Sequence, residues 1–274
     1  MGADMRTGWE REKRTHFDEI VVNYDKIRPE FPDKLFTDIF EYVGTDTVKK
    51  ALEIGAGTGK ATVPFLNAGY DVTAVEIGVN MASFLRERFK RFRNFSVRVA
   101  AFEDALLEEG AYELVYAATA FHWVDAEIGC PKVFRLLKSG GAFTLFRYNA
   151  IPADSGELYE EIQAIYEKYY YKPYIRPVKR TGEEFWEPSE IKRGFGFEDL
   201  KRYGFSDVSM KLYDAARTFD ADEYIALLET FSDHRSLPES DRAALYAGVK
   251  EAILKHGGRH KVDYVFQLYM GRKL

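Results

Sequence analysis

The sequence predicts an α/β fold in which helices connect the strands of a largely parallel sheet. Short apolar runs alternate with longer helical stretches from about residue 48 onward, as crossover connections between parallel strands require. A glycine-rich turn at residues 55–59 follows the first of these runs and precedes a helical stretch. Such a turn lets the backbone bend sharply and brings its N–H groups close to a ligand.

The apolar runs at 51–54, 71–76, 96–101, 112–118 and 142–147 are expected to be strands, and 208–213 and 261–270 to be two more near the end. Helices are expected at 61–68, 80–91, 126–137 and 156–171. Segment 17–42 indicates helical pieces broken at Pro29 and Pro32, because proline disrupts a helix interior.

Composition limits the class of protein. With 274 residues, of which 46% are hydrophobic and 30% charged, the chain can bury a sizeable core as one domain with insertions. A net charge of −5 disfavours a nucleic-acid-binding face, which needs clustered Lys and Arg. The single Cys130 permits no internal disulfide, and no apolar run suggests a membrane span or a signal peptide. We therefore expect a cytoplasmic protein with no membrane or nucleic-acid partner.

The spacing of the glycine turn excludes two phosphate-binding motifs. A P-loop needs a glycine at position 54 and Ser or Thr at 61, where this chain has Ile54 and Ala61. A dinucleotide fingerprint needs a glycine where Lys60 stands. Glu53 also faces the place that a pyrophosphate would occupy, so the turn favours a cationic ligand over an anionic one.

The sequence Leu-Glu-Ile-Gly-Ala-Gly-Thr-Gly at 52–59 resembles the first motif of class I S-adenosylmethionine (SAM) dependent methyltransferases. Segments 70–76, 112–118 and 136–143 resemble the second strand, the fourth strand and the turn into the fifth, in the family's order. Together they cover about residues 48–148. The segments 119–125, with its Ala-Phe-His-Trp sequence, and 28–32 resemble the trans-aconitate methyltransferase-like branch of the methyltransferase type 11 group.

This resemblance implies a Rossmann-like, seven-stranded, mostly parallel sheet with an antiparallel final strand and helical cap insertions. The whole chain, 1–274, is then a single methyltransferase domain. Residues 1–45 are expected to form an N-terminal helical cap and 46–150 the SAM-binding core. Insertions at 151–203 and 218–258 are expected to recognise the substrate, and 204–217 and 259–274 to close the sheet.

The resemblance also implies a cofactor site at the carboxyl ends of the strands. The backbone of the turn glycines would line SAM. Glu53 would accept a hydrogen bond from the amino group of SAM, directly or through water. Glu76 would bind both ribose hydroxyls of SAM. Ordinary solvated or paired acids are the alternatives for both glutamates, and core packing is the alternative for Met81 and Phe102. The expected set is Tyr24, Arg28, Glu53, Gly55, Ala56, Gly57, Thr58, Gly59, Glu76, Ile77, Met81, Phe102, Glu103 and Thr119.

The loop after the fourth strand would lie beside the transferable methyl group. His122 is the candidate general base or hydrogen-bond donor, with loop packing as the alternative, because an imidazole titrates near neutral pH. Substrate contacts are expected from Trp123, Tyr174, His234 and Arg235. The five histidines show no metal spacing, so no metal is expected.

We therefore expect a monomeric or homodimeric enzyme that moves a methyl group from SAM to a small molecule by in-line displacement. An oxygen acceptor, either carboxylate or hydroxyl, is the leading hypothesis. The alternatives are a SAM-binding regulatory or scaffold protein without turnover and an NAD-dependent oxidoreductase, which Glu53 and Lys60 disfavour. The sequence does not identify the acceptor.

Overall fold

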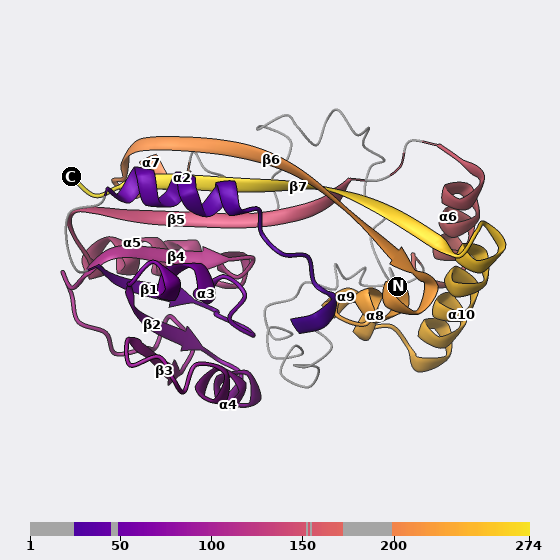
Figure 1. Cartoon of the computed structure of the whole chain (residues 1–274), viewed down its shortest axis with the longest axis horizontal. Helices are drawn as coiled ribbons and strands as arrows, with labels where there is room; N and C mark the ends of the chain where they lie inside the picture. The colour runs from indigo at the N-terminus through magenta and orange to yellow at the C-terminus, as the bar shows by residue number, and fades with distance from the viewer. Residues whose placement is uncertain (1–24, 45–48, 152, 154, 172–198) are drawn as a thin grey trace, which may run out of the picture. The chain divides into compact units, whose positions relative to one another are not determined.

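The computed structural model describes residues 25–44, 49–151, 153, 155–171 and 199–274 (Figure 1). Within these residues seven strands form one sheet in the order β3-β2-β1-β4-β5-β7-β6. The strands are β1 (Lys50–Ile54), β2 (Asp71–Glu76), β3 (Phe95–Val99), β4 (Tyr112–Ala118), β5 (Leu137–Ile151), β6 (Ser206–Asp220) and β7 (Arg259–Arg272). Neighbours from β3 through β5 are parallel, whereas β7 runs opposite to β5 (Figure 1). The predicted fold class is confirmed.

The fifth strand is longer than the sequence predicts. We expected it to begin at residue 142, after a turn at the glycine pair, but β5 begins at Leu137 and continues to Ile151. Its register with β4 shifts between the pairs Tyr112↔Leu137 and Leu114↔Ala142, so a bulge containing Gly140, at φ 79°, takes the place of the turn. A glycine with positive φ suits a bulge as well as a turn, which explains the difference.

Helices cover both faces of the parallel part of the sheet. On one face lie α2 (Asp33–Val43) and α3 (Thr62–Asn67), where Phe65 stacks on Tyr116 with ring centroids 4.1 Å apart and Phe36 meets Phe146 edge-on at 5.9 Å. The opposite face packs on α5 (Ala126–Leu136). Because side chains alternate along a strand, the α5 side takes the intervening buried residues Val115, Ala117, Phe143 and Leu145.

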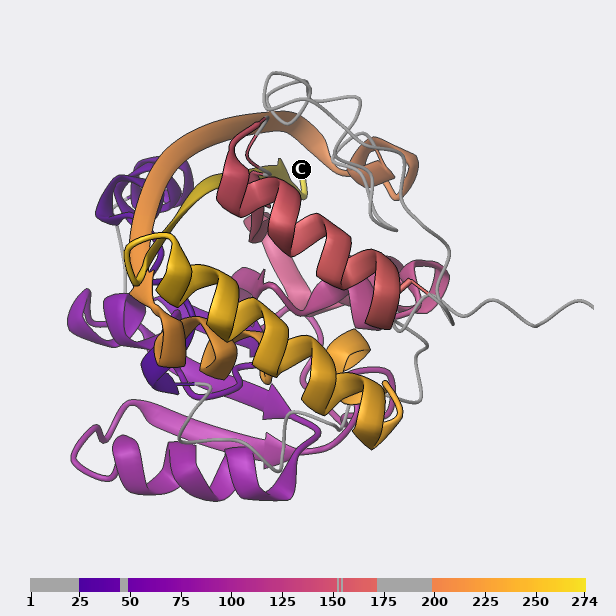
Figure 2. The same cartoon turned by 90° about the vertical axis from the view of Figure 1, so that its right-hand side faces the viewer.

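The described residues cluster into two compact units. The first takes in residues from 30–149, 189–214 and 265–274, and includes α4 (Val79–Arg88), the short 3-10 helix η2 (Phe121–Trp123) and α7 (Asp199–Arg202). The second takes in residues from 1–29, 150–188 and 215–264. There α6 (Glu157–Tyr169) packs beside α10 (Glu239–Lys255), and α8 (Ala221–Leu228) and α9 (Ser232–Arg235) belong to the same unit (Figure 2). The assignment of core and cap roles stays a prediction.

None of the helices in the described part of the chain combines the length and the apolar character that a bilayer span requires.

Candidate active site

The glycine turn after β1 has the conformation that its sequence indicates. Gly55, Gly57 and Gly59 all have positive φ, at 68°, 56° and 85°. A Cβ on Gly59 would lie 2.5 Å from the Phe89 ring, so this glycine permits close packing against α4. A Cβ on Gly57 would meet nothing within 4 Å. A Cβ on Gly55 would lie 2.6 Å from Ala120 Cβ, so the turn combines two glycines required for packing with one that leaves the backbone accessible to a ligand.

Glu76 connects this turn to the end of β2. Its Oε2 accepts a hydrogen bond from the backbone N–H of Gly57 at 2.8 Å, and its Oε1 accepts one from the N–H of Gly78 at 2.9 Å. The side chain is only 7% exposed. The arrangement fits the predicted role of binding vicinal hydroxyls beside the glycine turn.

Glu53 is fully buried beneath the turn. The hydroxyls of Thr62 and Tyr116 donate to its Oε2 at 2.6 and 2.9 Å, while its buried Oε1 has no hydrogen-bond partner in the described structure. Burial raises the pKa of Glu53 to about 8, helped by the nearby charge of Glu76 and opposed by the two hydroxyl donors. An ammonium group reaching Oε1, through water or after a small backbone movement, would satisfy that oxygen and favour its ionised form.

The loop after β3 is held by a lysine that sequence reasoning missed. Lys132 on α5 donates from Nζ to the backbone carbonyls of Phe102, Glu103 and Ala105 at 2.8, 3.1 and 2.6 Å. The Phe102 side chain is 4% exposed and belongs to the core on the α5 face, which agrees with the packing alternative for that residue. No local pattern around Lys132 indicates this contact, because it joins residues about 30 positions apart.

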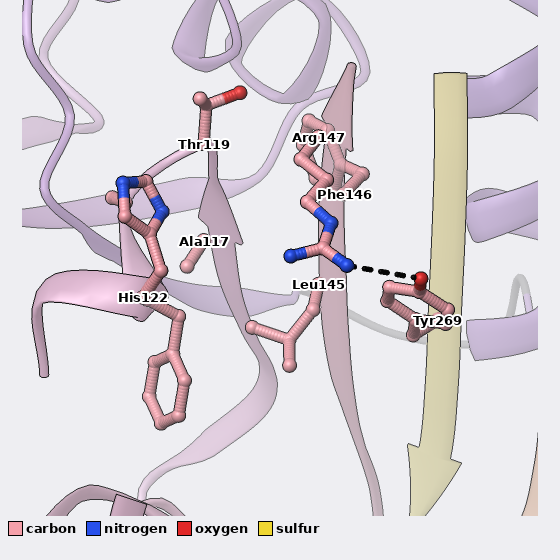
Figure 3. A pocket seen from close by; sticks show the side chains of 9 residues that line it. Ala117, Thr119, His122, Leu145, Phe146, Arg147 and Tyr269 are labelled. Carbon is pink, nitrogen blue, oxygen red and sulfur yellow. Dashed lines mark hydrogen bonds between the residues drawn. The ribbon is translucent and has the colours of Figure 1, made fainter. Parts of the chain in front are cut away.

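A pocket opens after β4, where the methyl-transfer site was expected (Figure 3). Its described lining consists of Ala117, Thr119, Ala120, Phe121, His122, Leu145, Phe146, Arg147 and Tyr269, around a space of about 330 Å³ that is partly open to solvent. Thr119 has a φ of 52°, which is unusual for a β-branched residue, and its buried Oγ1 has no hydrogen-bond partner within the described residues. Backbone strain of this kind is concentrated at functional sites.

Two of the predicted residues, His122 and Thr119, thus share one pocket with residues that sequence reasoning did not select. Arg147 on β5 donates from Nε to Oε1 of Gln267 at 2.8 Å and from Nη2 to the Tyr269 hydroxyl at 3.4 Å. The His122 imidazole lies on the other side of Ala117 from the Arg147 guanidinium (Figure 3). Trp123 follows His122 on η2, with ring centroids 5.1 Å apart. The sheet order β4-β5-β7 brings these residues together.

The other expected cofactor residues of the first unit lie around the turn and α4. Met81 and Thr58 are buried, each 2% exposed, Ala56 is 8% exposed, and Ile77 follows Glu76 in a half-buried position. Glu103 is half-buried in the loop held by Lys132. Tyr24 and Tyr174 lie outside the described residues. All these assignments to SAM or to substrate stay predictions.

Arg28, His234 and Arg235 belong to the second unit. Arg28 donates from Nη2 to the Thr230 carbonyl at 2.6 Å and lies over the Phe231 ring. His234 Nδ1 lies 3.1 Å from Asp233 Oδ1, and its Nε2 lies 2.9 Å from the Tyr166 hydroxyl. Burial of Asp233 opposes ionisation, but the contacts with His234 and the hydrogen bond from the Tyr170 hydroxyl together outweigh that effect and lower the pKa of Asp233 to about 2. These contacts stabilise the unit, and the predicted substrate roles stay predictions.

A comparison with protein families gives one match to this sequence. Residues 52–145 match the model described as a methyltransferase domain. The chain carries a SAM-dependent methyltransferase domain. This confirms the resemblance at the level of the class and of the enzyme, and gives SAM as the cofactor. Assignment to the trans-aconitate methyltransferase-like branch stays a prediction.

Individual proteins agree with this assignment. The methyltransferase is 25% identical over 237 residues to an uncharacterized methyltransferase of Schizosaccharomyces pombe, with 85% of each chain covered. It is 27% identical over 188 residues to a malonyl-[acyl-carrier protein] O-methyltransferase of Paenibacillus, with 64% of each covered. Its fold is similar to that of a putative type II methyltransferase from Anaeromyxobacter dehalogenans, with a TM-score of 0.60, 20% identity, and 90% and 98% of the two chains covered.

Proposed function

We propose that this methyltransferase transfers the methyl group of SAM to an oxygen of a small molecule, either a carboxylate or a hydroxyl. The arrangement of Glu76 carries the proposal, because it places a carboxylate at the end of β2 against the backbone of the glycine turn. SAM, when bound, supplies a methyl group attached to a positively charged sulfur. The protein must then hold the acceptor in line with that bond.

The residues present fit this cofactor at three points. Gly57 leaves space for a ligand next to its backbone, since a Cβ there would meet nothing within 4 Å. Glu76 would bind the ribose hydroxyls beside it. The buried Oε1 of Glu53 would accept a hydrogen bond from the amino group of the methionine part, which is cationic at pH 7. The acid at position 53 also suits a cationic ligand better than the pyrophosphate of a dinucleotide.

Positioning is the main contribution that the protein makes to the reaction. Holding two reacting groups in the correct geometry can lower a barrier by about 7–11 kcal/mol. A carboxylate acceptor is already ionised at pH 7 and needs no base. A hydroxyl acceptor would need one, and His122 in the pocket after β4 is the candidate. Trp123, next to it on η2, would shield the reacting groups from water.

An oxygen acceptor is favoured over a nitrogen by two observations. The pocket after β4 presents hydrogen-bond donors from His122, Arg147 and Tyr269, which suit an oxygen-rich acceptor. One of the chain's relatives, the Paenibacillus protein, is named as an O-methyltransferase. The acceptor in that protein's name carries a malonyl group, which ends in a carboxylate.

The test is incubation of the purified protein with SAM labelled in its methyl group, in the presence of a small-molecule extract. We expect label in small molecules, released by mild base if the product is an ester and retained if it is an ether. Glu76→Ala should abolish transfer, whereas Asp71→Ala, an exposed acid at the other end of β2, should not. Label found only in protein or nucleic acid would contradict the proposal.

Two other outcomes identify the alternatives. Binding of SAM without transfer to any acceptor would indicate a regulatory or scaffold protein. A rise in melting temperature with NAD, and none with SAM, would indicate an oxidoreductase.

A further inference from the structure

Tyr116 on β4 is the register partner of Glu53 on the neighbouring strand β1. Register partners in a parallel pair project to the same face of a sheet, so the two side chains lie side by side. The Tyr116 ring stacks on Phe65 of α3 with centroids 4.1 Å apart, and Tyr116 is 0% exposed. Its hydroxyl donates to Oε2 of Glu53 at 2.9 Å. Packing therefore holds this donor in place against the carboxyl group.

Thr62 makes the second contact and connects Glu53 to the glycine turn. It is the first residue of α3, and its N–H donates to the Gly59 carbonyl at 3.1 Å. Its hydroxyl donates to the same Oε2 of Glu53 at 2.6 Å, and Thr62 is 0% exposed. Both hydroxyls thus bind one oxygen of Glu53, whereas Oε1 is buried and has no hydrogen-bond partner within the described residues.

The two hydroxyls influence the charge of Glu53. A hydrogen bond to an ionised carboxylate is about twice as strong as one to a neutral group, so each donor favours the ionised form. Burial and the charge of Glu76 on β2 have the opposite effect and raise the pKa of Glu53 to about 8. Burial and the neighbouring Glu53 raise the pKa of Tyr116 well above its usual value, so Tyr116 stays a neutral donor. An ammonium group at Oε1 would add the third donor that makes ionisation favourable near neutral pH.

We propose that Tyr116 and Thr62 are positioning residues for SAM, because their bonds to Oε2 favour the ionised form of Glu53 and leave Oε1 to the amino group of the cofactor. This inference rests on the part of the proposed function that places that amino group at Glu53. When the ammonium binds, Glu53 loses its proton to the solvent and becomes a carboxylate. Cofactor binding below pH 8 is therefore coupled to the release of one proton.

The experiment is calorimetric titration with S-adenosylhomocysteine at several pH values, in pairs of buffers that differ in their heat of ionisation. At pH 6 the native protein should release about one proton per bound ligand, and Glu53→Gln none. Tyr116→Phe and Thr62→Val should each weaken binding about 5- to 10-fold at pH 7, because each loses a charge-assisted hydrogen bond that forms as Glu53 ionises. At pH 9 the loss should shrink to about twofold or less, because Glu53 is then largely ionised before the ligand binds.

Matched variants separate the loss of these two hydroxyls from a loss of packing. Tyr70→Phe and Thr144→Val each remove a buried hydroxyl that has no hydrogen-bond partner in the described part of the chain. Both should keep native affinity and native proton release. Thr62→Ser retains the hydroxyl and should recover the affinity that Thr62→Val loses.

A loss of affinity that is the same at pH 7 and pH 9 in Tyr116→Phe and Thr62→Val would overturn the inference, since a purely structural role has no such pH dependence. Binding by the native protein without proton release, or proton release that persists in Glu53→Gln, would also overturn it. These results leave the oxygen acceptor to the labelling experiment described above. Absence of S-adenosylhomocysteine binding by the native protein at every pH would overturn both the inference and the proposed function.

Discussion

The backbone N–H of Gly57 donates a hydrogen bond to Oε2 of Glu76 at 2.8 Å. This bond joins the ends of two adjacent parallel strands, because Gly57 lies in the turn after β1 and Glu76 ends β2. The carboxylate is thus fixed in a defined orientation, next to a glycine whose missing side chain leaves space. The two residues together form the part of the site on which the assignment of SAM chiefly depends.

Gly57→Ala should lose SAM affinity with only a moderate loss of stability. Its φ of 56° costs a non-glycine residue about 1–2 kcal/mol, but a Cβ there meets no neighbour within 4 Å. Gly69→Ala is the matched control, because Gly69 has a φ of 82° and equally open surroundings in the turn before β2. Urea unfolding should give similar losses for both variants, while calorimetry should show weakened SAM binding in Gly57→Ala alone. Equal SAM affinities in the two variants would contradict the role given to Gly57.

Glu53 should make stability depend on pH. Burial raises its pKa to about 8 from the usual 4.5 of a glutamate, so the folded protein binds more protons than the unfolded chain between these values. The contribution of protonated Glu53 to the stability of the folded protein is therefore complete below about pH 4.5 and is lost as the pH rises to about 8. Without ligand, the free energy of unfolding should fall more steeply from pH 5 to pH 8 in the native protein than in Glu53→Gln. The exposed variant Glu108→Gln should follow the native curve, and a Glu53→Gln curve parallel to it would show that Glu53 is not the titrating group.

Lys132→Met should weaken SAM binding without affecting the chemical step. Its three bonds to backbone carbonyls hold the loop after β3, which carries Phe102 and Glu103, two of the residues expected at the SAM site. Loss of those bonds should raise KM for SAM severalfold and leave kcat for a saturated enzyme nearly unchanged. Lys90→Met, on an exposed position after α4, provides the comparison. A fall in kcat with an unchanged KM for SAM would contradict this prediction, because it would show that Lys132 affects the chemical step and not SAM binding.

The sequence predicts five of the strands well, and β5 and β6 less well. β1, β2 and β4 are buried apolar runs bounded by glycines or acids, so their limits are close to those expected. β6 is half-exposed along most of its length, and a strand with no consistently buried face has a weak alternating pattern. For β5 the glycine pair indicated a turn, whereas the structure contains a bulge at that point.

The sequence singled out the residues of the candidate site at the ends of β1 and β2, whereas in the pocket after β4 it singled out Thr119 and His122 but not Arg147 or Tyr269. Glu53, Gly57 and Glu76 lie in short motifs whose order along the chain indicates their roles. Arg147 and Gln267 are 120 positions apart and meet only because β7 inserts beside β5 in the sheet. No local pattern marks such a pair, so only the folded chain reveals a cation in the pocket after β4.

The most direct test of the account is calorimetric titration of the native protein and of Glu76→Ala with S-adenosylhomocysteine, the demethylated product. We expect one site per chain with a micromolar dissociation constant in the native protein, at least about tenfold weaker binding in Glu76→Ala, and native affinity in Asp71→Ala. No measurable binding to the native chain, or equal affinity in Glu76→Ala, would contradict the site proposed here.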